Sequence, residues 1–328
     1  MTARAADIGV VAIGRNEGER LRACLSSVVA GAAATVYVDS GSTDGSPELA
    51  RGLGAAVVDL DMRLPFTAAR ARNAGFARLG ALAPELAYVQ FVDGDCEVDP
   101  HWLAVSRAFL EANPRVAAVC GRRRERFADR SVYNLMCDLE WDTPVGEARA
   151  CGGDVLMRTA ALRHVGGYRD DLIAGEEPEL CIRLRAGGWR IWRIDAEMTL
   201  HDAAMTRFGQ WWRRTTRAGF AFAEGAHLHG APPERHWVRE SRSAWAWGLG
   251  IPLLALTGAL LWGPWALLLL AIYPLQVLRL FLRSAGALKV RALRATFLVL
   301  GKFAEAFGQA KFVARRWSGG PARLIEYK

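Results

Sequence analysis

Two aspartates separated by a single glycine close a short apolar run in the segment FVDGDCEVDP, residues 91–100. Because Asp93 and Asp95 stand two residues apart, both carboxylates can point their oxygens at one hard cation. Mg²⁺ and Mn²⁺ prefer such oxygen ligands and commonly share them with phosphates. The alternative interpretation is an ordinary turn, since Asp-Gly is frequent in turns. The position of the motif, after the fourth of a series of apolar strands, favours the cation site.

Short apolar runs rich in β-branched residues must position these carboxylates. They alternate with helical stretches such as 17–30 and 46–54, a pattern typical of βαβ units and of an α/β fold with a mostly parallel sheet. Ligands bind such sheets at the carboxyl ends of the strands. Strands one, two and four end in the polar sequences GRNEG, DSGSTDGS and DGDCE. The expected strands cover residues 8–14, 35–40, 55–61, 87–93 and 116–121.

A long apolar stretch lies in the C-terminal part of the chain. The 36 residues between Arg242 and Arg279 carry no charge, and WGP (262–264) interrupts them near the middle. Since about 20 residues span a bilayer, this length allows two passes. Arginines flank both outer ends, so the positive-inside bias places both ends in the cytoplasm. We predict a helical hairpin, spanning or re-entrant; a buried pair of very apolar helices is the alternative.

The chain is therefore expected to divide into four parts: a nucleotide-binding half of about 1–120, an acceptor half of about 121–240, an apolar hairpin (241–284) and a basic amphipathic tail (285–328). The tail carries Leu293, Phe297, Leu300, Phe303 and Phe307 on one helix face. This pattern suits an interfacial helix; the alternative is a helix packed on the main domain.

Charge and cysteine usage exclude some classes of function. From residue 279 to 328 there are 11 Lys/Arg against 2 Asp/Glu, whereas the preceding residues are nearly neutral. This balance argues against a nucleic-acid groove in the main domain and favours a tail facing anionic lipid. The six cysteines form no CxxC pair and are expected to be reduced core thiols. The N-terminal residues run directly into a strand, so we expect no signal peptide.

Several segments, in the order in which they follow one another along the chain, resemble the family 2 glycosyltransferases, which have the Rossmann-like GT-A fold. They are VVAIGRNEGERL, VYVDSGSTDGS, ARARNAGF, FVDGDCEVDPHWL, GGDVLMRTAAL and GGYRDDLIAGEEPEL, within residues 8–220. The apolar stretch and basic tail are similar to those of membrane-attached bacterial members. The resemblance implies an inverting transfer from a nucleoside diphosphate sugar, with UDP the commonest carrier and Mg²⁺ or Mn²⁺ as the metal.

The resemblance also implies roles for single residues at the donor site. Asp95 would bind the metal directly and His201 would complete the metal site, an ordinary partly buried histidine being the alternative. Asp93 would lie near the ribose or behind the metal. The remaining nucleotide-sugar contacts would come from Glu17, Asp39, Arg72, Asn73, Asp154, Arg213 and Arg217. A first-turn helix carboxylate is the alternative for Glu17, and a turn or cap is the alternative for Asp39.

On the acceptor side, GEEPEL (175–180) resembles the family's acidic motif, whose second carboxylate is the general base. That residue is Glu177, where Asp is commoner, and Glu176 would lie beside the acceptor. An acidic helix start is the alternative. Trp211 or Trp212 would stack on a sugar; the alternative is an amphipathic helix lying on the membrane or on the domain.

We therefore expect an enzyme on the cytoplasmic face of the inner membrane that extends a lipid-linked saccharide in surface polysaccharide or glycolipid synthesis. One alternative has a polyprenyl phosphate as the acceptor, and this acceptor needs no general base. A nucleotidyltransferase would need a lysine-rich triphosphate loop, and GRNEGERL has no lysine. A catalytically inactive membrane scaffold of the same fold is the non-enzymatic alternative.

Overall fold

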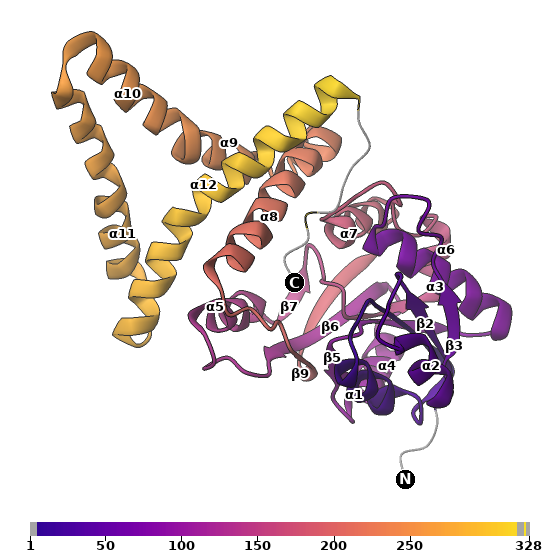
Figure 1. Cartoon of the computed structure of the whole chain (residues 1–328). Helices are drawn as coiled ribbons and strands as arrows, with labels where there is room; N and C mark the ends of the chain where they lie inside the picture. The colour runs from indigo at the N-terminus through magenta and orange to yellow at the C-terminus, as the bar shows by residue number, and fades with distance from the viewer. Residues whose placement is uncertain (1–4, 320–324, 326–328) are drawn as a thin grey trace. The chain divides into compact units, whose positions relative to one another are not determined.

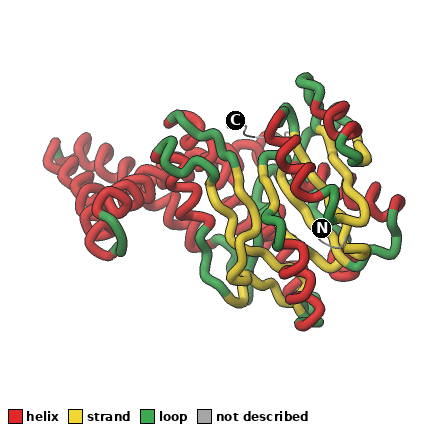
Figure 2. The backbone as a smooth tube through the Cα atoms, turned by 90° about the horizontal axis from the view of Figure 1, so that it is seen from below, coloured by secondary structure: helices red, strands yellow, loops and turns green. Residues whose placement is uncertain are grey.

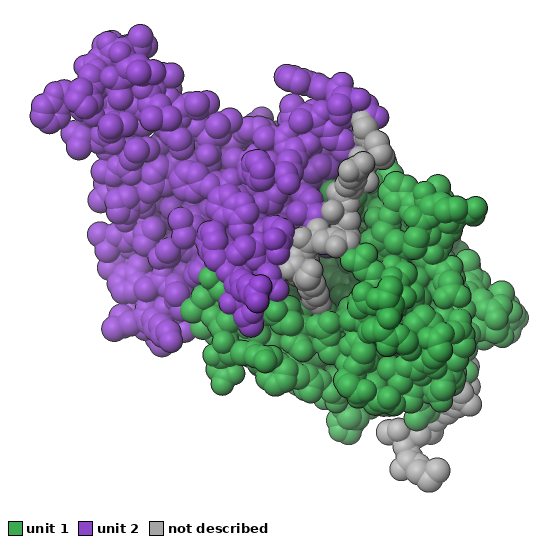
Figure 3. Space-filling model, viewed as in Figure 1, with its two compact units in different colours: residues 1–204, 322–324 green, residues 205–321, 325–328 purple. Residues whose placement is uncertain are grey.

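The computed structural model of the chain describes residues 5–319 and 325. The chain divides after Ala204 into two compact units, coloured green and purple in Figure 3. Residues 205–240, which we expected in the acceptor half, belong to the same unit as the C-terminal helices. The reason is helix α8 (Phe208–His229), which packs along the last long helix, α12 (Leu288–Ser318). That the acceptor half of the functional domain ends near residue 240 stays a prediction.

The described residues of unit 1 form a nine-stranded sheet in the order β3-β2-β1-β4-β8-β6-β9-β5, with β7 beside β9. Figure 2 shows these strands grouped together with helices around them. The strands are β1 (Ala5–Gly14), β2 (Ala32–Asp39), β3 (Ala56–Asp59), β4 (Tyr88–Asp93), β5 (Cys96–Val98), β6 (Val116–Glu125), β7 (Gly146–Ala148), β8 (Val155–Arg158) and β9 (Arg190–His201). The helices are α1 (Glu19–Val28), α2 (Ser46–Gly52), α3 (Ala68–Leu82), α4 (Trp102–Ala112), α5 (Val132–Trp141), α6 (Thr159–His164) and α7 (Glu176–Ala186).

All five expected strands are present, and the sheet is parallel from β3 through β4. Beyond β4 the sheet is mixed, because β8 runs antiparallel to both β4 and β6. This direction matters for the site. Val155 pairs with Phe91, so the start of β8 lies at the carboxyl end of β4 and brings the preceding GGD segment to Asp93.

Close packing of small and branched residues holds the helices on this sheet. A Cβ on Gly75 of α3 would lie 2.3 Å from Val11 Cγ1 and 2.8 Å from Val38 Cγ2. Glycine at this position therefore lets α3 lie directly against β1 and β2. Residues 8–13 of β1 and 35–39 of β2 are all buried, as expected for a sheet covered on both faces.

Unit 2 is helical in its described residues. After α8 come α9 (Val238–Trp245), a π-helical turn (Ala246–Gly250), α10 (Ile251–Trp262), a 3₁₀-helix (Pro264–Ala271), α11 (Ile272–Arg283) and α12. Two continuous helical segments, Val238–Trp262 and Pro264–Arg283, are long and apolar enough to cross a membrane by length and composition. They meet at Gly263, whose φ of 101° ends the first segment, and they form the two arms left of α12 in Figure 1. The predicted break at WGP is confirmed.

Helix α12 packs through a face that the sequence did not indicate. A Cβ on Gly308 would lie 2.0 Å from Thr216 O, and a Cβ on Gly219 of α8 would lie 2.1 Å from Glu305 O. Leu300 and Phe307, two of the five large apolar residues expected on an interfacial face, are 38% and 51% exposed. Two helices that approach this closely need small residues at the closest contact, and large side chains such as Phe297, whose ring centroid lies 4.8 Å from that of Trp211 on α8, pack alongside it.

Candidate active site

The carboxyl ends of β1, β2 and β4 bring the predicted donor-site residues to one edge of the sheet. Gly14 of β1 pairs with Asp39 of β2, and Ile13 pairs with Asp93 of β4. Glu17 follows β1, and a Cβ on Gly94 would lie 3.3 Å from its side chain. Strand order alone therefore gathers these carboxylates, as the sequence predicted.

Two arginines and four carboxylates form a buried network at this edge. Arg72 lies 3.0 Å from Asp93, 3.0 Å from Glu176 and 2.9 Å from Glu177. Arg123 of β6 lies 2.9 Å from both Asp93 and Asp154. Each buried guanidinium is thus paired, which buried charges require. The network ties α3, β4, β6, β8 and α7 to one another.

Asp93 is held inside this network as an anion. Burial acts to raise its pKa, but Arg72 and Arg123 outweigh burial, and the net shift is downward. The backbone N–H of Asp93 donates to Asp154 Oδ1 at 3.1 Å, and Thr199 donates to Asp154 Oδ2 at 2.7 Å. A Cβ on Gly153 would lie 2.4 Å from Arg72 and 3.2 Å from both carboxylate oxygens of Asp93. Glycine at 153 is therefore what lets the GGD segment approach Asp93 and Arg72.

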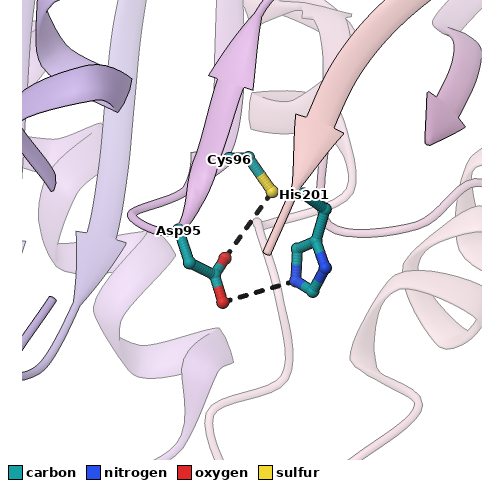
Figure 4. A group of neighbouring side chains, drawn as sticks. All are labelled: Asp95, Cys96 and His201. Atoms are coloured by element: carbon teal, nitrogen blue, oxygen red, sulfur yellow. Dashed lines mark hydrogen bonds and ion pairs between the residues drawn. The ribbon is translucent and has the colours of Figure 1, made fainter. Parts of the chain in front are cut away.

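Asp95 lies beside His201, and its carboxylate also faces Cys96 (Figure 4). Asp95 Oδ2 is 3.3 Å from His201 Nε2, and Cys96 Sγ is 3.6 Å from Asp95 Oδ1. Ligand atoms of these three residues lie within 4.8 Å of one another. Sheet register explains the meeting, since Cys96, the first residue of β5, pairs with His201, the last residue of β9.

The chemistry of this cluster fits a divalent cation. Burial, followed by the nearby Arg123, lowers the pKa of His201, so its imidazole is neutral at pH 7 and offers a lone pair. Burial raises the pKa of the Cys96 thiol well above its usual value, so the sulfur stays protonated and is a poor ligand. Asp95 and His201 are therefore the residues able to hold the ion, one through oxygen and one through nitrogen.

Glu177 has the properties of a base that works near neutral pH. Burial, together with the neighbouring Glu176, raises its pKa to about 7, although Arg72 opposes the shift. The carboxylate is half-buried at the start of α7, whereas Glu176 is almost fully buried. An acidic helix start alone does not require this burial. Glu177 lies at the end of the Arg72 network. It is therefore a candidate base, whereas Asp95 and His201 are the candidate cation ligands.

Known proteins resemble this chain in sequence or in fold. The family described as Glycosyl transferase family 2 matches residues 10–150, which run from within β1 to just past β7 and include both aspartates of the DGD segment. The chain resembles this family through that segment, which is less than half of its length. Succinoglycan biosynthesis protein ExoA of Rhizobium meliloti (strain 1021) is 31% identical over 186 residues, which are 54% of this chain and 55% of that protein. The chain thus spans about half the length of this curated relative.

Solved structures resemble the chain in fold at low sequence identity. The mannosyltransferase PcManGT from Pyrobaculum calidifontis, solved in complex with GDP-Man and Mn²⁺, has a TM-score of 0.57 at 20% identity over 96% of this chain and 88% of that chain. A mycobacterial protein has a TM-score of 0.50 at 19% identity over 70% of this chain and 78% of that chain. The predicted GT-A fold is confirmed, and the family model agrees with the predicted family over residues 10–150.

Two of the residues predicted to contact the nucleotide are engaged by the protein itself. Asp39 accepts from the backbone N–H groups of Gly41 and Ser42 at 2.9 and 2.8 Å, the turn role that was its alternative. Asn73 donates to Tyr168 O at 2.8 Å and to Asp170 at 2.7 Å, and it accepts from Tyr168 N at 2.9 Å. Both residues shape the site; their contact with a nucleotide stays a prediction.

The predicted α8 residues lie in unit 2. Trp211 is buried, with its ring centroid 4.8 Å from that of Phe297 on α12, and Trp212 is half-buried. Arg213 is exposed and Arg217 is half-buried. The amphipathic helix that was their alternative is therefore present, and their roles at the acceptor or the pyrophosphate stay predictions.

Sequence reasoning missed two residues of the candidate site, which lie on β6. Arg123 and Glu125 stand two residues apart and so share one face of the strand. Arg123 enters the carboxylate network, and Glu125 faces His201. The signal in the sequence was a strand that continues past its apolar run into RRRE, with charged residues at buried positions.

Proposed function

We propose that this protein is a metal-dependent, inverting glycosyltransferase attached to the cytoplasmic face of the inner membrane. It would move a sugar from a nucleoside diphosphate sugar to a hydroxyl of a lipid-linked saccharide in surface polysaccharide or glycolipid synthesis. The observation that carries the proposal is the edge of unit 1 itself: an Asp95–His201 pair suited to a cation and a Glu177 carboxylate with a pKa of about 7 belong to one sheet edge.

The residues of this site would each have a role in the transfer. A bound Mg²⁺ or Mn²⁺, held by Asp95 and His201, would supply positive charge to the departing diphosphate. Glu177 would take the proton of the acceptor hydroxyl as its oxygen bonds to the anomeric carbon and the bond to the phosphate oxygen breaks. The deprotonated Glu177 is paired with Arg72, which keeps the base in place between turnovers. One base and a single displacement give inversion.

The similar proteins support the donor class and the product class. PcManGT was solved with GDP-Man and Mn²⁺, and ExoA is named for succinoglycan biosynthesis. A nucleoside diphosphate sugar donor and a polysaccharide product agree with both. UDP, GDP and dTDP are therefore the carriers to test.

We expect one nucleoside diphosphate to bind the purified full chain tightly only when Mn²⁺ is present. Calorimetric titration of UDP, GDP and dTDP into protein in detergent, each with and without Mn²⁺, identifies the carrier and narrows the sugar. The metal dependence follows from Asp95 and His201, since two neighbouring carboxylate and imidazole ligands leave positions for phosphate oxygens. Absence of metal-dependent binding for all three nucleotides would refute the proposal.

Membrane attachment is supported by the two apolar segments of unit 2. Their surface is covered with exposed leucines, among them Leu254 (65% exposed) on the first arm and Leu268 (68% exposed) on the second. The basic residues Arg279 and Arg283 lie at the end of the second arm, Lys289 follows it, and all three suit anionic headgroups. Such an anchor would keep the enzyme at the surface where a lipid-linked acceptor lies.

Replacing Leu254 and Leu268 together by arginine should release the full chain from membranes. An arginine at the middle of a membrane helix costs about 2.5–3.5 kcal/mol on insertion scales, so two should lower partitioning by orders of magnitude. Co-sedimentation with vesicles that contain anionic lipid measures the bound fraction. The matched control is Leu64→Arg with Leu82→Arg, two exposed leucines of unit 1, which should stay bound. Equal sedimentation of both variants would refute the anchor.

A further inference from the structure

Glu125 is a buried carboxylate to which neither the sequence nor the family match gives a role. It is the last residue of β6, and sheet register pairs it with His201 of β9. Its Oε1 accepts from Phe127 N at 3.1 Å and from Asn134 Nδ2 at 3.0 Å. Its Oε2 accepts from Ala203 N at 3.0 Å. Three donors from three segments therefore fix the orientation of this carboxylate.

The remaining hydrogen-bonding position of the Glu125 carboxylate faces His201. Oε2 lies 3.6 Å from His201 Nδ1, while the other ring nitrogen, Nε2, faces Asp95. Nδ1 is buried and makes no hydrogen bond within the described residues at this distance. The ring is also held from the side, since the Trp141 ring contacts it edge-on at 4.7 Å between centroids. The imidazole thus lies between two carboxylates.

We propose that Glu125 is a positioning residue that holds the N–H of His201 on Nδ1 and thereby leaves the Nε2 lone pair, together with Asp95, facing a divalent cation. The inference rests on the proposed function, since it concerns the same metal site. A neutral imidazole carries a single N–H, and the two carboxylates compete for it. If Asp95 took that proton through Nε2, the ring would have no lone pair to give on the side of the metal.

Geometry favours Glu125 in this competition once a cation is present. A cation on Asp95 and Nε2 excludes a proton from Nε2, so the proton must lie on Nδ1 and must find an acceptor. Glu125 Oε2 is that acceptor, and closing the gap from 3.6 Å to about 2.9 Å needs only a small movement of the ring. Metal-bound histidines commonly donate their second N–H to a carboxylate, which fixes the tautomer and the ring orientation.

The first test needs no substitution. The full chain, labelled with ¹⁵N-histidine and dissolved in detergent, is titrated with diamagnetic Cd²⁺, and the ring nitrogens of His201 are followed by NMR, with His201→Gln used for assignment. We expect a protonated Nδ1 and an unprotonated, metal-shifted Nε2. Cd²⁺ on Nδ1, or a proton that stays on Nε2, would overturn the inference.

The second test compares two carboxylates of β6 and β5, the strands that flank β9. Glu125→Gln should weaken Mn²⁺ binding to the full chain by about 10- to 100-fold, as measured by electron paramagnetic resonance of free Mn²⁺. The control Glu97→Gln removes the same charge from β5, where Glu97 pairs with Arg126. It should leave Mn²⁺ affinity within about twofold, because a partly exposed charge is screened by solvent.

The outcomes separate this inference from the proposed function. Equal Mn²⁺ affinity of Glu125→Gln and wild type overturns the role of Glu125 and leaves the transferase proposal standing. A wild-type protein that binds no Mn²⁺ overturns both. Glu125→Gln places an amide N–H against other donors and can misfold for that reason, in which case the NMR result on the wild type decides.

Discussion

Replacing Asp95 by asparagine should abolish metal-dependent nucleotide binding and lower kcat/KM by about 10³-fold, the scale seen when a group that stabilises developing charge is removed. The substitution keeps the size of the side chain and removes its charge. Because Asp95 and His201 are the residues that fit the cation, the imidazole would remain with a single neutral oxygen ligand beside it. Calorimetry with and without Mn²⁺ measures the loss of binding, and a sugar-transfer assay measures the loss of rate.

The matched control for this substitution is Asp59→Asn. Asp59 ends β3 at the same edge of the sheet, as Asp93 ends β4, but it is exposed and pairs with Arg51. We expect wild-type binding and turnover from this control. If Asp95→Asn kept metal-dependent binding and full activity, the DGD segment would be a turn, and an inactive scaffold would become the better interpretation.

Replacing Glu177 by glutamine should lower kcat by about 10²- to 10⁴-fold with little change in donor affinity, because a general base acts only as the acceptor proton leaves. Glutamine keeps the shape of the side chain but takes up no proton. A transfer assay at saturating donor and acceptor measures kcat. The control Glu48→Gln removes an exposed carboxylate from the first turn of α2, the position that Glu177 has in α7, and should leave kcat unchanged.

The same base gives the wild-type enzyme a defined pH profile. Since burial raises the pKa of Glu177 to about 7, the carboxylate is protonated and inactive below that pH. We expect kcat/KM to fall about tenfold per pH unit below 7 and to reach a plateau above it. Glu177→Gln should remove this limb. A mild effect of the substitution, with no change in the profile, would indicate an acceptor that is already anionic, such as a polyprenyl phosphate.

Local sequence was enough to predict the elements that carry the site. The period of the apolar runs gave all five expected strands, and the polar residues after strands one, two and four meet at one edge. Parallel βαβ connections make this inevitable, because every such strand ends on the same side. The uncharged stretch with its WGP break likewise predicted two apolar helical segments and the point where they part.

The pairing of strands that lie far apart in the chain determined the parts of the site that the local sequence pattern could not predict. Strands β8 and β9 are far along the chain from β4, and no period within them states their direction or partner. Only the antiparallel course of β8 brings Gly153 and Asp154 to Asp93. Only the pairing of β9 with β5 and β6 puts His201 between Asp95 and Glu125.

By itself, the sequence determined which residue types stand at the ends of strands and which stretches can enter a membrane, since both follow from short-range periodicity and composition. The tertiary structure decided the charge state of the site and the helix face that packs. The pKa of Glu177 depends on burial and on Arg72, which lies more than 100 residues earlier in the chain. The packing face of α12 depends on how closely α8 approaches, which the large apolar residues of α12 do not reveal. Both are distances between segments remote in sequence, and only the folded chain sets them.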